Sequence, residues 1–239
     1  MISVYAALRA KSRPVYQIYV NRDRMPPGIG RVLDLAERQN VPVGYLSLGE
    51  IDDMASGHSH GGTIALAGER RCVDLDELFV PAGTPFLVML DGVEDPYNFG
   101  QAVRSLYAAG ATGLILKPRN WMSAAGVVAR ASAGASELLR CAVAETVSSA
   151  AESCAAAGVS VVALDEDGDR SIFESDLTVP VMLLIGGEQR GITRSFLRAG
   201  FAAVRIPKAR PDARALGTAA SAAVAGFEVM RQRTQSTGG

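Results

Sequence analysis

Short apolar runs and one amphipathic stretch follow one another in the first third of the chain. Residues 15–20 (VYQIYV) are mostly β-branched or aromatic, which predicts a strand. Between residues 29 and 39 the apolar positions recur at helical spacing, so we expect a helix there. Residues 41–46 and 63–67 are two further predicted strands. This order predicts a small α/β unit at the N-terminus.

A proline- and glycine-rich break, VPAGTP, lies between residues 79 and 85 and predicts a domain boundary. We therefore expect an N-terminal domain at 1–80 and a second domain at 81–239. Beyond the break, apolar strands alternate with helices, a pattern typical of an α/β fold whose mostly parallel sheet is covered on both faces. The predicted strands are 86–90, 113–116, 160–164, 181–185 and 203–206, and the predicted helices are 101–109, 124–130, 146–157, 193–199 and 218–233. Ligands bind such sheets beyond the carboxyl ends of the strands.

Composition narrows the class of protein. Of the 239 residues, 48% are hydrophobic and 21% are charged, which is typical of a globular chain rather than a disordered one. No window approaches the roughly 18 consecutive apolar residues of a membrane span. The first twenty residues do not resemble a secretory signal, because Arg9, Lys11 and Arg13 interrupt the apolar run.

Cysteine and histidine usage bears on the compartment and on metals. Cys72, Cys141 and Cys154 are an odd number without CxxC spacing, and there are only two histidines. We therefore expect no metal site and a reducing, cytoplasmic location.

The formal net charge of −1 argues against nucleic-acid binding through bulk charge, so a polyanion would need a local basic patch. Two clusters qualify as RNA-binding candidates, although such clusters are often only solvated faces. The candidates are Arg9, Lys11 and Arg13 with Arg70 and Arg71 in the first unit, and Arg205, Lys208, Arg210 and Arg214 near the end.

The first segment with candidate chemistry is residues 90–104 (LDGVEDPYNFGQAVR), where a strand enters a turn-rich loop and then a helix. Asn98 and Arg104 flank the start of that helix, and Gly100 permits a close backbone approach. The alternative interpretation is an asparagine cap and a solvated arginine on the helix surface.

The second segment, residues 184–192 (LIGGEQRGI), is a strand end followed by glycines and the carboxylate of Glu188. Gly186 and Gly187 would let a ligand lie against the backbone, although glycine after a strand often marks only a turn. The third segment joins residues 204–208 (VRIPK) to 215–221 (ALGTAAS). Small residues continue down the last helix at Ala219, Ala222, Ala223 and Gly226. The alternative to a role in function is that they only allow close packing against a neighbouring helix.

In this order the three segments resemble the motifs of the SpoU (TrmH) family of RNA 2′-O-ribose methyltransferases in the SPOUT superfamily, over nearly the whole chain. The N-terminal third, with His60-Gly61-Gly62 before a strand, resembles the family's ribosomal-protein-like RNA-recognition domain. Residues 130–135 (RASAGA) resemble its small-residue stretch between the first and second motifs. The resemblance implies a C-terminal trefoil knot that binds S-adenosylmethionine. It also implies a homodimer with each active site at the subunit interface.

Position by position, the resemblance implies that Asn98, Arg104 and Glu188 are active-site residues. The assigned cofactor-binding positions are Gly186, Gly187, Ile206, Leu216 and Gly134. The third motif departs from the family, since Ala215-Leu216-Gly217 stands where most members have Ser-Leu-Asn. Two polar side chains are thus missing, and the hydroxyls of Thr218 and Ser221 lie at other positions.

Methyl transfer to a ribose hydroxyl requires aligned reactants and removal of the hydroxyl proton, with no need for a metal. Arg104 either acts as the base, which is unusual for a guanidinium, or binds RNA phosphate and stabilises developing alkoxide charge. Asn98 positions Arg104 or the ribose, and Glu188 orients Arg104 or Asn98 through a charge-assisted hydrogen bond.

Two other functions compete with an active methyltransferase. A SpoU-like dimer that binds RNA or S-adenosylmethionine without methylating would explain the altered third motif, whereas the intact Asn98, Arg104 and Glu188 argue against it. A nucleotide-dependent oxidoreductase is disfavoured, because no GxGxxG opens the first strand–helix–strand unit. The sequence leaves open whether the substrate is ribosomal or transfer RNA.

Overall fold

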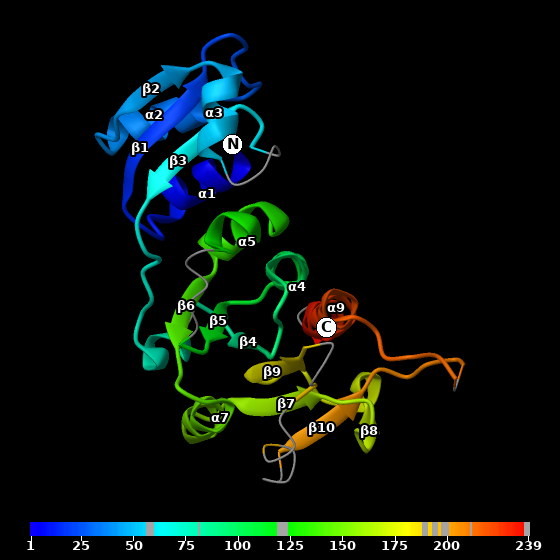
Figure 1. Ribbon diagram of the computed structural model, residues 1–239. Coiled ribbons are helices and arrows are strands. Elements are labelled where there is room, and N and C mark those ends of the chain that lie inside the picture. The colour runs from blue at the N-terminus through cyan, green and yellow to red at the C-terminus, as the bar shows by residue number, and fades with distance from the viewer. Residues whose placement is uncertain are drawn as a thin grey trace.

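Two β-sheets organise the chain, one in each part of the sequence (Figure 1). The computed structural model describes residues 1–55, 60–80, 82–118, 124–187, 191–192, 196, 201–210 and 212–236. We call the part from the first helix to the third strand the N-terminal unit, and the part that contains the larger sheet the C-terminal unit.

A three-stranded sheet forms the N-terminal unit, in the order β2-β1-β3, with β1 parallel to β2 and antiparallel to β3. The three predicted strands and the helix at 29–39 are confirmed to within about two residues. Two helices were missed, one of which, α3, starts at the capping box of Ser47 and Glu50. The elements are α1 (Ile2–Ala10), β1 (Val15–Asn21), α2 (Gly30–Arg38), β2 (Val43–Leu46), α3 (Leu48–Met54) and β3 (Thr63–Ala67).

Seven strands in the order β6-β5-β4-β9-β7-β10-β8 form the sheet of the C-terminal unit. Every neighbouring pair is parallel, as the continuous apolar strands predicted. The strands are β4 (Phe86–Asp91), β5 (Gly113–Leu116), β6 (Arg140–Val143), β7 (Ser160–Leu164), β8 (Arg170–Ser171), β9 (Val181–Gly186) and β10 (Ala202–Arg205). The helical elements are η1 (Leu75–Leu78), α4 (Pro96–Ala108), α5 (Ala125–Ala131), α6 (Ala135–Leu138), α7 (Val147–Ala156), η3 (Ile172–Glu174) and α9 (Thr218–Ser236).

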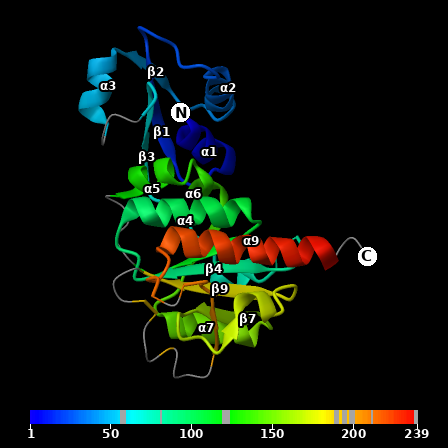
Figure 2. The same cartoon turned by 90° about the vertical axis from the view of Figure 1, so that its right-hand side faces the viewer.

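Helices cover both faces of this sheet, with α4 and α9 on one face and α7 on the other (Figure 2). The central strand β4 is buried along its whole length, so Val88 packs towards α4 and α9 while Met89 packs towards α7. The fold class is therefore confirmed, and the knot stays a prediction from the resemblance.

Some sequence-based boundaries need correction. The helix predicted at 101–109 begins at Pro96, because Asp95 caps it and proline suits the first helical position. The strands β6 and β8 were missed, since β6 begins at the charged Arg140 and β8 has only two residues. Apart from Phe196, the helix predicted at 193–199 lies outside the described residues.

Several small residues of α9 pack against neighbouring elements within the chain. Ala222, Ala225 and Gly226 are buried, and a Cβ on Gly226 would lie 3.1 Å from Ala109 Cβ just after α4. This confirms close helix packing at Ala222 and Gly226.

The N-terminal unit rests on α5 and α6 through α1. Ser3 Oγ donates to Ala129 O at 2.9 Å, and Gly134 lies so close to α1 that a Cβ would be 2.7 Å from Ala6 Cβ. Gly134 also has a φ of +82°, which favours glycine. No helix within the described ranges is long and apolar enough to cross a membrane.

Candidate functional site

The first two motifs meet at the carboxyl ends of neighbouring strands. Asp91, the last residue of β4, pairs in register with Gly186, the last residue of β9. One residue later, Gly187 N donates to Asp91 O at 2.7 Å. A Cβ on Gly187 would lie 2.1 Å from Gly92 O, so this close approach of two backbones excludes any side chain.

The start of α9 brings the third motif to the same place. Thr218 is buried, and its Oγ1 donates to Gly186 O at 3.1 Å. Ser221 Oγ donates to Leu216 O at 3.3 Å, so both nearby hydroxyls hold backbone in place. Ile206 packs against the core below this point, whereas the side chain of Leu216 is 43% exposed. The fold thus assembles Gly186, Gly187, Ile206 and Leu216 around one group of strand ends.

A buried ion pair that the sequence did not reveal supports the first motif. Lys117 Nζ, which lies just after β5, contacts the carboxylate of Asp91, whose side chain is only 4% exposed. A buried carboxylate is stable only when it is paired, so Lys117 helps to hold the end of β4. A lysine directly after a buried strand was the only sequence signal.

Helix α4 presents the two catalytic candidates of the first motif. Asp95 caps the helix by accepting hydrogen bonds from Tyr97 N (3.2 Å) and Asn98 N (3.1 Å). Asn98 is half-buried and Arg104 is exposed. Tyr97 and Arg104 are two helical turns apart and so share one exposed face. Glu188, the third candidate, lies outside the described residues.

Gly100 confirms the expected close approach on α4, although its neighbour is another helix. A Cβ there would lie 2.6 Å from Ala131 Cβ and 2.9 Å from Val128 O, both of α5. The glycine therefore sets the packing distance between α4 and α5.

The predicted RNA-binding residues divide into exposed cations and paired ones. Arg9, Lys11, Arg210 and Arg214 are exposed. By contrast, Arg13 forms an ion pair with Glu137, and Lys208 Nζ contacts Glu166 Oε1 at 2.6 Å. Gly134 contacts α1, so its assignment to the cofactor site stays a prediction that these contacts do not support.

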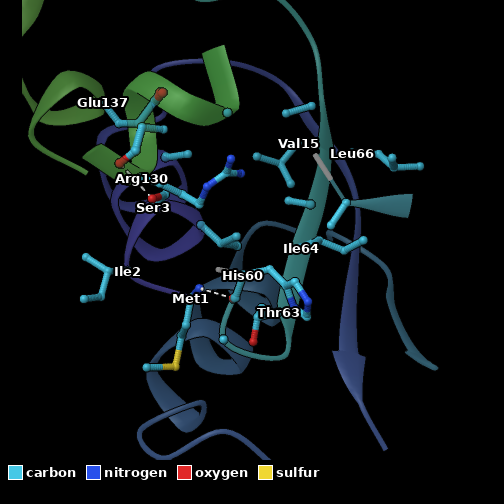
Figure 3. A pocket seen from close by; sticks show the side chains of 18 of the residues that line it. Met1, Ile2, Ser3, Val15, His60, Thr63, Ile64, Leu66, Arg130 and Glu137 are labelled. Atoms are coloured by element: carbon cyan, nitrogen blue, oxygen red, sulfur yellow. Dashed lines mark hydrogen bonds between the residues drawn. The ribbon is translucent and has the colours of Figure 1, made fainter. Parts of the chain in front are cut away.

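Residues of β3, α1 and α5 line a cavity of about 750 Å³ (Figure 3). His60 borders it, with Nδ1 accepting from Gly62 N at 3.1 Å and Nε2 contacting Asp52 Oδ1 at 2.7 Å. These contacts place the ring proton on Nε2. The buried Thr63 Oγ1 has no hydrogen-bond partner within the described residues. This cavity belongs to the junction of the two units and not to the motif strand ends.

Comparison with known families identifies the chain. Residues 85–227 match the SpoU rRNA Methylase family, and residues 2–71 match the RNA 2′-O ribose methyltransferase substrate binding family. The chain belongs to the SpoU rRNA methylase family. The first match includes every motif residue described above at the strand ends.

Similar proteins extend over almost the whole chain. The 23S rRNA (guanosine-2′-O-)-methyltransferase RlmB of Pseudomonas putida is 30% identical over 235 residues, which cover 97% of this chain and 94% of the relative. An AdoMet-bound rRNA methyltransferase from Sinorhizobium meliloti superposes with a TM-score of 0.75 at 25% identity, covering 95% of this chain and 84% of that one. The SpoU methyltransferase AviRb of Streptomyces viridochromogenes, at 24% identity, shares the fold with a TM-score of 0.77 over 98% and 88% of the two chains.

Family membership fixes the class of reaction. The chain is an RNA 2′-O-methyltransferase that depends on S-adenosylmethionine. The oxidoreductase alternative is thereby excluded.

Proposed function

We propose that this SpoU enzyme methylates the ribose 2′-hydroxyl of a guanosine in large-subunit ribosomal RNA. The observation that carries the proposal is its near full-length similarity, at 30% and 29% identity, to the RlmB proteins of two Pseudomonas species. A ribosomal substrate is in keeping with a cytoplasmic location. Transfer RNA is the competing substrate, because other relatives bear names that include both RNAs.

The residues at the strand ends fit the cofactor. Gly186 and Gly187 carry no side chains where their backbone lies against Gly191 and Gly92, and Leu216 is exposed. Backbone groups of Gly186, Ile206 and Leu216 would hold the adenosyl part of S-adenosylmethionine. When bound, the cofactor supplies an electrophilic methyl group on a sulfonium.

Arg104 and Asn98 serve the RNA side of the reaction in this proposal. Arg104 is an exposed cation on α4, which suits binding of an RNA phosphate and stabilisation of charge that develops on the ribose oxygen. Asn98, half-buried near the start of the same helix, orients the ribose or Arg104. Glu188 would orient Arg104 or Asn98.

A homodimer would complete the site. Large apolar side chains stay exposed on α4, on α9 and just before α9, and clustered exposed apolar groups mark interaction surfaces. We call this set the apolar face; its members are Tyr97, Tyr107, Leu216, Phe227 and Met230. Because Tyr97 and Arg104 share one side of α4, a partner on this face would lie beside the catalytic arginine.

The two units have separate tasks in this proposal. Residues 1–80 form an RNA-recognition domain with Arg9 and Lys11 exposed, and residues 81–239 form the knotted catalytic domain. Arg210 and Arg214 provide a phosphate track beside the third motif. When Arg210 and Arg214 are replaced to test this track, a change at Lys208 is the matched control, because its ammonium group is already paired with Glu166.

Two measurements test the proposal. Isothermal calorimetry with S-adenosylmethionine, followed by tritium transfer from the labelled cofactor to total RNA, separates an active enzyme from a non-catalytic binding dimer. Mass mapping of ribose methylation in cells with and without this protein then identifies the RNA. Loss of one methylated guanosine from 23S rRNA is expected. Loss of a transfer-RNA methylation instead would overturn the ribosomal assignment.

A further inference from the structure

Two cysteines that are far apart in the sequence lie side by side at the edge of the large sheet. Cys72 Sγ and Cys141 Sγ are 3.1 Å apart, although the two residues are 69 positions apart in the sequence. Cys72 belongs to the segment that connects the two units, and Cys141 belongs to β6. Figure 1 shows this connection running from β3 down to the sheet edge beside β6.

Backbone pairing holds the two cysteines in register. Val73 forms a parallel bridge with Ala142, and Val73 N donates to Cys141 O at 2.8 Å. The preceding residues, Cys72 and Cys141, are therefore neighbours on adjacent extended segments. Their thiols meet because the backbone places them together, so a bond between the sulfurs needs no large rearrangement of the chain.

The two thiols differ in access, which gives an oxidation an order. Cys72 is exposed and borders a cavity of about 190 Å³, whereas Cys141 is buried. A reagent in solution can therefore reach Cys72 first. Burial and the hydrogen bond to Cys141 raise the pKa of the Cys72 thiol to about 12, which makes its thiolate scarce at neutral pH and the first step slow.

Arg70 favours the second step. Its Nε lies 2.9 Å from Cys141 Sγ, and another of its guanidinium nitrogens donates to Leu139 O, which fixes the cation beside the sulfur. Cys141 Sγ is therefore held 3.1 Å from Cys72 Sγ, where it is placed to attack a sulfur bonded to Cys72.

We propose that Cys72 and Cys141 are a redox pair that forms an intramolecular disulfide when the protein meets a small disulfide such as oxidised glutathione. The Cys72 thiolate attacks one glutathione sulfur, forming a mixed disulfide and releasing one glutathione thiolate. The Cys141 thiolate then attacks Cys72 Sγ and releases the second glutathione. Two protein thiols are oxidised and one glutathione disulfide is reduced to two thiols.

The bond would lock the connection between the two units to the catalytic sheet. It closes a long loop, so it restricts the unfolded chain more than the folded one and should raise Tm by roughly 5–10 °C. A reducing compartment reverses the bond, because glutathione attacks it by the same exchange.

The test uses the full-length reduced protein, oxidised glutathione and intact-mass spectrometry. We expect wild type to become lighter by two hydrogen masses, with one peptide linking Cys72 to Cys141 and with Cys154 still free. Cys154→Ser should behave as wild type. Cys72→Ser, a change at an exposed position, should form neither the glutathione adduct nor the internal disulfide.

Cys141→Ala should stop at one glutathione attached to Cys72, which distinguishes a pair from an isolated thiol. Circular dichroism of each variant establishes that it is folded. Wild type that keeps three free thiols, or that accumulates the glutathione adduct without forming the internal bond, would overturn the proposal. These outcomes do not depend on methyl transfer.

Discussion

Arg13 and Glu137 form a two-point ion pair that joins the N-terminal unit to α6, across 124 residues of sequence. Arg13 Nε lies 3.0 Å from Glu137 Oε2, and Nη2 lies 2.9 Å from Oε1. Ser12 Oγ also donates to this carboxylate, and the two side chains are only 13% and 4% exposed. The planar guanidinium matches the carboxylate, so a residue expected to bind RNA instead holds the two units together.

Replacing Arg13 should therefore destabilise the protein. Arg13→Ala leaves a buried carboxylate without its cation, which typically costs about 3–5 kcal/mol of unfolding free energy. Urea unfolding followed by circular dichroism measures the loss. Arg9→Ala, at an exposed position, is the control and should change stability by less than about 0.5 kcal/mol. Equal effects of the two changes would contradict the structural role of Arg13.

Arg104→Ala should abolish methyl transfer and leave the affinity for S-adenosylmethionine within a few-fold, because Arg104 is assigned to the RNA side. Steady-state tritium transfer and calorimetry measure the two quantities. Arg104→Lys keeps the charge without the planar fork and tests whether geometry matters. If the alanine variant kept more than about a tenth of the wild-type rate, the loss of barrier stabilisation would be under roughly 1.4 kcal/mol and the assignment would be wrong.

Restoring the third motif with Ala215→Ser and Gly217→Asn should leave cofactor binding intact, since Leu216 and Ile206 are assigned backbone contacts. In an active enzyme the wild type already transfers methyl groups, so the double change should be neutral or harmful. A large rise from a negligible rate would instead identify a degenerate enzyme. Failure of folded wild type to bind S-adenosylmethionine at millimolar concentration would contradict both the active-enzyme and the degenerate-enzyme interpretation.

The apolar face should hold two copies of the chain together. Sedimentation of wild type at micromolar concentration should give a dimer, and Phe227→Glu with Met230→Glu should give a monomer, because carboxylates would be buried at the contact. Tyr16→Glu changes an exposed aromatic residue of the N-terminal unit and should remain dimeric. A monomeric wild type would contradict the proposal that the active site is shared between two subunits.

Stability should fall as the pH rises above 9, partly through Cys154. Burial raises the pKa of its thiol to about 12 in the folded state, so between pH 9 and 12 the folded chain keeps a proton that the unfolded chain has lost. The stability present below pH 9 is then lost by up to about 1.4 kcal/mol per pH unit. Cys154→Ala should show a shallower slope in urea unfolding of the reduced protein between pH 8 and 10.5. Parallel slopes would mean that Cys154 titrates alike in both states.

Much of the C-terminal unit was predictable because local pattern and tertiary environment agree there. The run Phe86–Leu90 is apolar at every position, since a central parallel strand is buried on both faces, and the structure has β4 there. The boundary of α4 was missed by five residues although Asp95 and Pro96 are a standard helix start. The motif segments were found at the strand ends, where Asp91, Gly186 and Thr218 now prove to be in contact.

The sequence by itself determined most strands, most helices and the motifs, because backbone periodicity and capping depend on neighbours a few residues away. Only the tertiary structure decided what each polar side chain is bonded to. Lys117 contacts Asp91, which lies 26 positions away, and Arg13 contacts Glu137, which lies 124 positions away. The residues around each lysine or arginine in the sequence do not indicate which carboxylate it pairs with. Such pairings follow from how the sheet and helices pack, so an arginine predicted for RNA can be a structural cation. Two cysteines without a motif can likewise lie in contact.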